Sequence, residues 1–316
     1  MKVDPHQSSA LGPLVLILGP TAVGKTWVSL RLAEALDGEI VSADSRQVYR
    51  EMDIGTAKAT PAQRAQVPHH LIDVVDPDET LTLAQFQRLA YAAIDGILAR
   101  VNLPFLVGGS GQYVRAVVEG WSVPEVAPQE RLRAALETLD GDALARWLET
   151  LDPVAAGRID RRNRRRMIRA LEVTLVTGRP ISAQQSKSPP PYRILQVGLA
   201  LARPLLYERL DARVDQMLAA GLLEETRRLA ERYGWDVPAM SGLGYAQLGA
   251  YLRGEMTLAE SVAAIKRETR RFVRHQANWF KRNDPKIHWF NAAEPVQAAA
   301  AIERLVRDWL VGSTSR

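Results

Sequence analysis

The sequence contains no cysteine, which excludes disulfide bonds and cysteine-ligated zinc sites. Long apolar runs are missing as well. The aliphatic run nearest the start, 14–18, is far shorter than the ~20 residues of a membrane-spanning helix, and no secretory leader pattern precedes it. These absences favour a protein of the reducing cytoplasm with no membrane attachment.

Lysine is scarce: only seven of the 41 basic residues are Lys, so arginine carries most of the positive charge. The net charge of +5 permits an anionic partner without requiring one. The chain has 316 residues, of which 47% are hydrophobic, and this share excludes general disorder. At about 150 residues per domain, the length suggests two domains or one core with a large insertion.

Short aliphatic segments alternate with helical patterns along the first half of the chain. Residues 14–18, 40–43 and 105–107 are typical of strands buried on both faces, and 84–100 has the spacing of a helix. This alternation predicts an α/β fold, a P-loop NTPase-like parallel sheet with crossover helices. Later in the chain we expect strands at 194–201 and 287–290, a run of helices over 204–283, and a surface helix over 296–311.

Residues 122–190 differ in character from the segments on either side. They are charged and helical in pattern, and the segment 186–191 that closes them has the composition of a linker. We therefore predict a helical insertion domain over 122–190, within a core formed by 1–121 and 191–316 that includes a helical C-terminal region. The polar, Pro- and Gly-containing residues 1–13 predict a loose start.

The strongest motif lies directly after the first expected strand, where residues 19–26 fit G-x-x-x-x-G-K-[ST] and open an amphipathic helix. In such a loop the backbone N–H groups face phosphate oxygens, Lys25 adds a positive charge and Thr26 holds Mg²⁺. The motif indicates a polyphosphate ligand without saying which one. Its residues are Gly19, Pro20, Thr21, Ala22, Val23, Gly24, Lys25 and Thr26.

Other polar residues follow neighbouring strands and should meet this loop at one edge of the sheet. Ser110, in the glycine turn 108–111, could donate a hydrogen bond to the same ligand or lie in an ordinary flexible turn. Asp44 ends the second expected strand and could hold Mg²⁺, act as a general base or cap a helix. Asp73 and Asp76 are rival acidic candidates, although the proline after Asp76 predicts a turn there.

Two stretches are strongly basic. Residues 158–169 contain seven Arg against one Asp, and 264–286 contain eight Lys or Arg against two acidic residues, with aromatics interleaved. One such stretch is usually a solvated helix face, but two of them beside a phosphate-binding core favour a nucleic-acid backbone as partner. Arg131 and Arg133 begin the insertion and could reach a phosphate as an arginine finger does; the sequence does not distinguish between them.

These motifs in combination resemble the bacterial tRNA dimethylallyltransferases, also called isopentenyl-tRNA transferases. The resemblance covers about 14–283, and its most specific part is the Asp-Ser-x-Gln-x-Tyr pattern that begins at Asp44. One departure is Ser110, which stands where family members commonly have Thr. The matching segments are 19–26, 42–49, 52–58, 68–73, 106–109, 152–156, 169–173 and 242–245.

The resemblance implies transfer of a dimethylallyl group from dimethylallyl diphosphate to N6 of adenosine 37 in tRNA, beside the anticodon. The loop 19–26 then grips the donor's diphosphate, with Thr21 at its bridging oxygen and Mg²⁺, the implied cofactor, near Thr26. Asp44 accepts a proton from the adenine amino group. The implied catalytic residues are Asp44, Thr21, Ser110 and Arg131, of which Ser110 and Arg131, with Lys25, neutralise the leaving diphosphate.

The resemblance also implies three tRNA-contacting segments. The insertion would be an arm that clasps the anticodon stem-loop, and the analogy favours a monomer in the cytoplasm. The tRNA-contacting residues implied are Asp44, Ser45, Arg46 and Gln47; Arg165, Arg166, Met167, Ile168 and Arg169; and Gly244 and Tyr245.

Two other classes of function remain open on the residues alone. A small-molecule P-loop kinase, or a prenyltransferase acting on free adenine nucleotides, would need neither basic stretch. A non-catalytic, ATP-dependent RNA-binding switch would require Lys25 and Thr26 but not Asp44.

Overall fold

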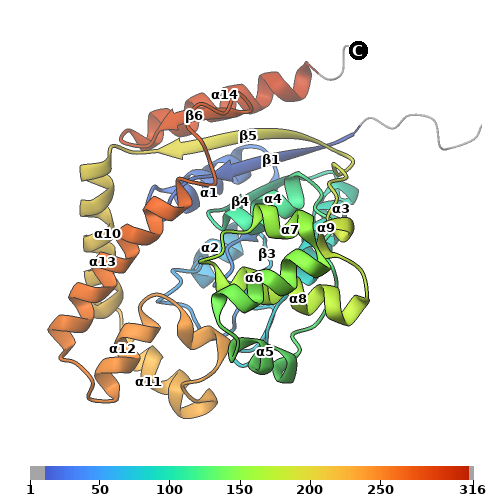
Figure 1. Ribbon diagram of the computed structural model, residues 1–316. Helices are drawn as coiled ribbons and strands as arrows, with labels where there is room; N and C mark the ends of the chain where they lie inside the picture. Colours follow the sequence, from blue (N-terminus) through green and yellow to red (C-terminus); the bar gives the residue numbers. More distant parts are fainter. Residues whose placement is uncertain (1–10, 313–316) are drawn as a thin grey trace, which may run out of the picture. The chain divides into compact units, whose positions relative to one another are not determined.

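The structure is a computed structural model that describes residues 11–312 (Figure 1). Among these residues it has one six-stranded sheet with the order β3-β2-β4-β1-β5-β6, and every neighbouring pair is parallel. The predicted α/β class with a parallel sheet is therefore confirmed. The strands are β1 (Gly12–Leu18), β2 (Gly38–Ala43), β3 (His69–His70), β4 (Leu103–Gly108), β5 (Tyr192–Ala200) and β6 (Ile287–Asn291).

The chain divides into two compact units. The first comprises Met1–Leu81, Arg88–Val114 and Pro191–Arg316, as far as these are described, and holds the sheet; the second comprises Thr82–Gln87 and Arg115–Pro190. The second unit thus begins seven residues before the predicted boundary at 122 and takes up the start of α3. The loose start predicted for 1–13 lies mostly outside the described residues.

Helices occupy each region where the sequence predicts them, and α2 and α4 are additional. In the first unit and across its boundaries they are α1 (Lys25–Ala35), α2 (Pro61–Gln66), α3 (Leu83–Ala99), α4 (Gly111–Val118), α10 (Arg203–Ala219), α11 (Leu222–Tyr233), α12 (Tyr245–Leu252), α13 (Leu258–Gln276) and α14 (Pro295–Val311), with a 3₁₀ turn at Pro238–Ser241. In the second unit they are α5 (Glu130–Glu137), α6 (Gly141–Leu151), α7 (Pro153–Arg158), α8 (Arg164–Thr177) and α9 (Ile181–Gln184). No helix among the described residues is long and apolar enough to cross a membrane.

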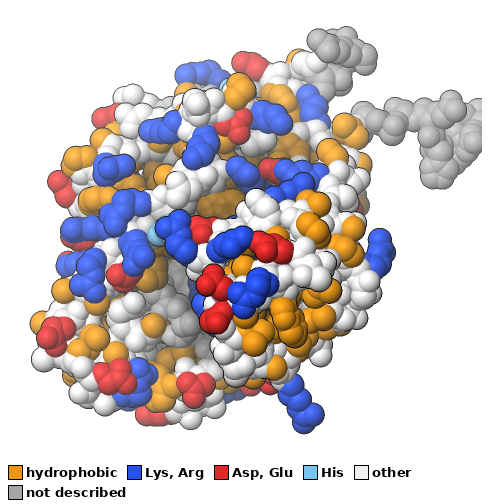
Figure 2. Space-filling model, in the orientation of Figure 1, with side chains coloured by type: hydrophobic (Ala, Val, Ile, Leu, Met, Phe, Trp, Pro, Cys, Tyr) orange, Lys and Arg blue, Asp and Glu red, His pale blue; other side chains and the backbone are white. Residues whose placement is uncertain are grey.

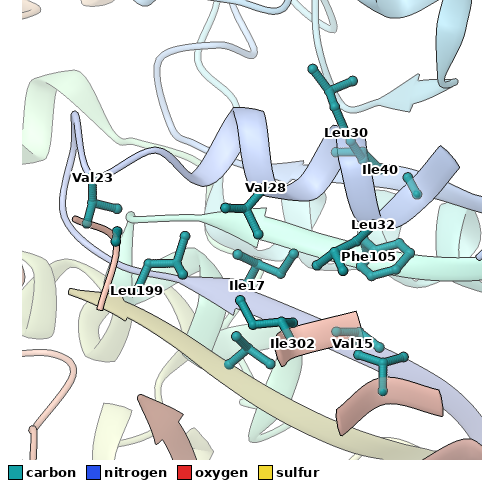
Figure 3. Packing of buried hydrophobic residues seen from close by; sticks show 14 of the residues in the cluster. Val15, Ile17, Val23, Val28, Leu30, Leu32, Ile40, Phe105, Leu199 and Ile302 are labelled. Carbon is teal, nitrogen blue, oxygen red and sulfur yellow. The ribbon is translucent and has the colours of Figure 1, made fainter. Parts of the chain in front are cut away.

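Alternation along β1 places its side chains on both faces of the sheet. Val15 and Ile17 point to the face covered by α1 and α14, where they pack with Val28 and Ile302 (Figure 3). All four side chains are essentially inaccessible to solvent, and burying each stabilises the fold by roughly 1.5–3 kcal/mol. Because β1 is held on both faces and by two neighbouring strands, the loop that follows it starts from a rigid point.

The second unit has a separate apolar core. Helices α6 and α8 pack on each other, and α5, α7 and α9 complete the cluster. Leu144, Leu148 and Leu171 are fully or almost fully buried in it. The unit is thus held together by its own helices, in agreement with the expected helical character of this region.

Candidate active site

Three turns follow the carboxyl ends of three adjacent parallel strands. In the sheet β4 lies between β2 and β1, so the turn that begins at Asp44, the glycine turn 108–111 and the phosphate-binding loop 19–26 emerge side by side. Ligands bind at this edge of open α/β sheets because the strand ends leave a crevice there. The order of the strands, which the motifs alone do not reveal, brings these three segments together.

The loop 19–26, which matches the phosphate-binding motif, leads from β1 directly into α1. Gly24 is the N-cap of α1 with φ 104°, a left-handed conformation that glycine adopts without strain, and no side chain caps the helix. The first N–H groups of α1 are therefore left for an anion. Lys25 donates from Nζ to the carbonyl oxygens of Gly19 at 2.9 Å and Pro20 at 2.8 Å, so its ammonium group lies over the loop.

Burial lowers the pKa of Lys25 to about 8, and the charge of Asp44 opposes this shift while that of Arg213 adds to it. The three charges therefore lie within electrostatic reach of one another. Burial also lowers the pKa of Arg213, again against the influence of Asp44. Arg213, on α10, is a further candidate site residue, and no local pattern in the sequence marks it among so many arginines.

Asp44 lies in a turn rather than at a helix start, so the helix-capping alternative is wrong. Its Oδ1 accepts the backbone N–H of Arg46 at 2.9 Å. The neighbouring Ser45 donates its backbone N–H to Oγ of Ser110 at 3.1 Å, and Ser110 donates to Oγ of Ser45 at 3.3 Å. The Ser110 hydroxyl thus connects the turn of Asp44 with the glycine turn.

Arg46 and Gln47 hold the rest of the Asp44–Gln47 segment through side-chain hydrogen bonds, and those of Arg46 reach distant residues. Arg46 donates to the carbonyl of Pro238 at 3.1 Å and to the hydroxyl of Ser241 at 3.2 Å. The Gln47 amide accepts the hydroxyl of Ser42 at 2.9 Å and donates to the carbonyl of Thr56 at 3.3 Å. Both side chains position the turn, whatever contacts they also make with a ligand.

The segment of Gly244 and Tyr245 is held in place by a hydrogen bond from the buried Tyr245 to Glu225. Tyr245 is 1% exposed, and its hydroxyl donates to Glu225 at 2.6 Å. The buried Glu225 carboxylate also accepts the backbone N–H groups of Asp53, Ile54 and Gly55 at 2.9–3.2 Å. A tRNA contact at this segment would therefore involve the backbone around Gly244 and not the phenol.

The rival carboxylates are engaged in ion pairs. Asp73 accepts from Lys58 and from Arg64, each at 2.6 Å, and Asp76 pairs with Arg50 at 2.9 Å. Lys58 and Asp73, together with Arg213, line a cavity of about 1090 Å³ in the first unit. Asp73 and Asp76 thus serve the local structure, which leaves Asp44 as the candidate base.

Arg131 and Arg133, which the sequence does not distinguish, have different environments in the second unit. Arg133 binds the buried Glu172 with two hydrogen bonds of 2.8 and 2.9 Å, and Arg169 adds a third of 2.6 Å. Burial alone would raise the pKa of Glu172, but hydrogen bonds from Arg133, Gln129 and Arg169 outweigh it and lower the pKa to about 2. Arg131 is exposed and forms none of the ion pairs identified among the described residues.

The first basic stretch is also divided by the structure. Met167 and Ile168 are 1% and 7% exposed and belong to the core of the second unit, so their side chains do not face a ligand. Arg165 and Arg166 are exposed on the opposite side of α8. Only part of the predicted segment 165–169 therefore offers side chains to nucleic acid.

The second basic stretch includes α13, and Lys and Arg side chains gather over α10 and α13 on the left of Figure 2. Lys266 pairs with Asp215 at 2.7 Å, and Arg270 pairs with Asp211, so these two cations tie α13 to α10. The exposed arginines of α13 lie at helical spacing on another face of the helix: Arg267, Arg271 and Arg274.

The residues around the loop would provide few ligands for a metal ion. The described residues contain no cluster of three His, Cys, Asp or Glu side chains able to hold one. Thr26 is exposed at the first turn of α1. This donor set fits Mg²⁺, which proteins commonly bind through one or two side chains with substrate phosphates and water completing the shell.

Sequence comparisons agree with this geometry. The family model described as IPP transferase matches residues 47–283, and one described as isopentenyl transferase matches 12–72. The tRNA dimethylallyltransferase of a Roseiflexus species is 55% identical over 303 residues, which cover 94% of this chain and 99% of that protein. That of Dehalococcoides mccartyi is 46% identical over 305 residues, covering 95% and 93% of the two chains.

Solved structures show the same relationship. The tRNA isopentenylpyrophosphate transferase of Bacillus halodurans is 40% identical with a TM-score of 0.72, over 96% of this chain and 98% of that one. A eukaryotic dimethylallyltransferase acting on tRNA has a TM-score of 0.83 at 26% identity, over 95% and 80% of the two chains. Coverage is nearly complete on both sides for the bacterial relatives. This chain belongs to the IPP transferase family.

Proposed function

We propose that this protein is a tRNA dimethylallyltransferase, which transfers the dimethylallyl group of dimethylallyl diphosphate to N6 of adenosine 37 in tRNA. The observation that carries the proposal is the placement of a phosphate-binding loop, a glycine turn and the Asp44 carboxylate at the ends of three adjacent strands. A diphosphate can thus be held beside a proton acceptor. Family membership supports the same reaction.

The loop 19–26 binds the diphosphate of the prenyl donor. Backbone N–H groups at the start of α1 face its oxygens, and Lys25 and Ser110 contribute a charge and a hydroxyl. Thr21 lies beside the oxygen that bridges carbon and phosphorus. As the C1–O bond breaks, diphosphate leaves with the electron pair, and these donors stabilise the charge that accumulates on it.

Asp44 is the general base. The exocyclic amine of adenine is conjugated with the ring and is a poor nucleophile, so it needs a positioned acceptor for its proton. N6 forms a bond to C1 of the dimethylallyl group while its proton passes to Asp44. The electrostatic influence of Asp44 on Lys25 and Arg213 supports its position beside the departing diphosphate.

The metal proposed for this reaction is Mg²⁺. Thr26, in the first turn of α1, would hold it together with oxygens of the diphosphate. When bound, it would supply positive charge at the leaving diphosphate.

The tRNA is bound by exposed arginines in both units. Arg165 and Arg166 on α8, and the exposed arginines of α13, contact the phosphate backbone of the anticodon stem-loop. Arg131 contributes a further charge toward the diphosphate.

The adenine must leave the loop stack to reach Asp44, which costs a few kcal/mol, and phosphate contacts offset that cost. The second unit is the arm that clasps the RNA, and the monomeric enzyme works in the cytoplasm, where its substrate is found.

The proposal is tested by incubating the protein with Mg²⁺, dimethylallyl diphosphate and unmodified tRNA, followed by mass spectrometry of the nucleosides. N6-(dimethylallyl)adenosine from position 37 is the expected product. Parallel reactions with free adenine nucleotides, and with ATP in place of the prenyl donor, should give no product. Prenylated free nucleotide or a phosphorylated product with tRNA unmodified would contradict the proposal.

A further inference from the structure

A buried amide joins two of the three turns of the site. Gln276 is the last residue of α13 and is 6% exposed. Its Oε1 accepts the backbone N–H of Thr21 at 3.0 Å, and its Nε2 donates to the carbonyl oxygen of Gly109 at 3.0 Å. One side chain, 255 residues distant from Thr21 in sequence, thus spans the phosphate-binding loop and the glycine turn.

The glycine turn is shaped to admit the end of α13. A Cβ atom on Gly109 would lie 2.5 Å from Nε2 of Gln276, and one on Gly111 would lie 2.1 Å from Cγ of Trp279. The first would displace the Gln276 amide from its hydrogen-bonding position, and the second would force the segment that follows α13 away from the turn. These glycines therefore serve the approach of Gln276 and Trp279.

The chemistry of the bridge selects an amide. One end must accept a hydrogen bond and the other must donate one, and among uncharged side chains of this length only glutamine offers both. A methionine would fill the same volume but leave the Thr21 N–H and the Gly109 carbonyl without this partner. Because polar groups that lose their hydrogen-bond partner in the interior are costly, the two turns would rearrange.

We propose that Gln276 is a positioning residue of the donor site. It holds Thr21 and the glycine turn, and with it Ser110, at the separation at which their hydroxyls converge on the donor's diphosphate. It acts through these two turns and touches neither substrate. Because the backbone N–H of Thr21 already donates to Oε1 of Gln276, Thr21 can contact the diphosphate only through its hydroxyl. The inference rests on the proposed function of the loop as a diphosphate site.

The test compares wild type with Gln276→Met, which removes both hydrogen bonds, and Gln276→Asn, which keeps the amide but is too short to span both turns. Gln63→Met is the matched control, because Gln63 also accepts a backbone N–H, from Thr60 at 2.9 Å, at the start of α2. For each protein, KM is measured for dimethylallyl diphosphate and for tRNA, and Kd for inorganic pyrophosphate with Mg²⁺.

We expect Gln276→Met to raise the KM for dimethylallyl diphosphate and the Kd for pyrophosphate about tenfold, the effect of losing about one hydrogen bond between the displaced turns and the diphosphate. Gln276→Asn should show a smaller rise in the same two constants. The KM for tRNA should stay within about twofold in both variants, and the control should match wild type. Gln276→Asn keeps the test valid if Gln276→Met does not fold.

A purely structural role predicts a different result: a lower melting temperature and a smaller active fraction, with all three constants unchanged. That result would overturn the inference while leaving the proposed function intact. If the wild type binds pyrophosphate but makes no prenylated tRNA, the proposed function fails, and the pyrophosphate constants still decide the role of Gln276. A wild type that does not bind pyrophosphate overturns both.

Discussion

The donor site and the exposed arginines of α8 and α13 are both proposed to bind anions, but the first is partly enclosed and the second are exposed to solvent. At the donor site, backbone N–H groups and the partly enclosed Lys25 lie on a rigid sheet edge, and the pKa of Lys25 is lowered to about 8, mainly by burial. On α8 and α13, exposed guanidinium groups lie on helix surfaces. Arg267 and Arg271 there pair only loosely with Glu268, at 3.5 and 3.7 Å, whereas Lys266 and Arg270 pair closely with acidic residues of α10.

The difference predicts how each region responds to conditions. A buried site with a titrating lysine should bind its anion in a way that depends on pH and weakly on salt. Exposed arginines, which stay charged at all accessible pH values, should bind in a way that depends on salt and not on pH. Binding of the diphosphate and binding of the tRNA can therefore be distinguished by changing the pH and the salt concentration separately.

The largest effect is expected from the carboxylate at the donor site. Asp44→Asn keeps an oxygen for the Arg46 N–H but removes the proton acceptor, so kcat should fall about 10²- to 10⁴-fold. Binding of pyrophosphate and tRNA should change little, as measured by calorimetry and filter binding. Asp76→Asn, a surface carboxylate paired with Arg50, is the control. An unchanged single-turnover rate for Asp44→Asn would rule out the base.

The next effect concerns the arginine surfaces. The double variant Arg165→Gln/Arg166→Gln should weaken tRNA binding about 10- to 100-fold and reduce the slope of log K against log salt by up to about two. The control pair in the same stretch is Arg161→Gln/Arg162→Gln, because these arginines already pair with Glu149 and Asp160. Equal losses in both pairs would mean that net charge, and not the exposed residues, determines binding.

The same test applies to α13. Replacing Arg267, Arg271 and Arg274 by Gln should lower tRNA affinity and the salt slope without affecting the melting temperature, because these side chains are exposed. Lys266→Gln/Arg270→Gln should instead lower the melting temperature, because it loosens α13 from α10, and should leave tRNA affinity and the salt slope unchanged. A lower salt slope only in the second variant would contradict the assignment.

A smaller effect concerns pH. Lys25 is protonated below about pH 8 and binds an anion best in that form, so pyrophosphate affinity should fall up to tenfold for each pH unit above 8. Lys25→Arg, which stays charged, corrects for the titration of pyrophosphate itself. The affinity for tRNA should be flat over the same range. A pyrophosphate profile identical in wild type and Lys25→Arg would show that Lys25 does not titrate there.

The smallest effects separate Arg131 from Arg133 in the second unit. Arg131→Gln should lower kcat about three- to tenfold with an unchanged melting temperature, as expected for loss of one charge-assisted hydrogen bond to a ligand. Arg133→Gln should instead lower the free energy of unfolding by roughly 1–3 kcal/mol, because Glu172 is left buried with fewer partners. Because the folded pKa of Glu172 is about 2, this contribution is present above pH ~4.3 and is lost as the pH falls toward 2.

The parts of the molecule that local patterns specify could be predicted. The strands β1, β2 and β4 are aliphatic runs buried on both faces, and the loop 19–26 is a contiguous motif whose position between a strand and a helix was itself predictable. The two-residue strand β3 was missed because His69–His70 has neither length nor an apolar run.

What could not be predicted depends on contacts between distant segments. Gln276, Arg213 and Glu225 serve the site through partners more than 150 residues away or through charge alone, and no local spacing marks them. Met167 and Ile168 show the converse. The helical period of α8 places both residues on its buried face, beside exposed arginines. The same period, visible in the sequence, distinguishes these two core residues from the arginines of the segment.

In the proposed reaction, one sheet edge holds an isoprenoid diphosphate and presents a base to an extruded adenine. The most direct measurement is a crystal structure with an unreactive thio analogue of dimethylallyl diphosphate, Mg²⁺ and an anticodon stem-loop. We predict the diphosphate on the N–H groups of the loop 19–26 and the adenine N6 within hydrogen-bonding distance of Asp44. A diphosphate bound elsewhere, or an adenine still stacked in its loop, would contradict the account.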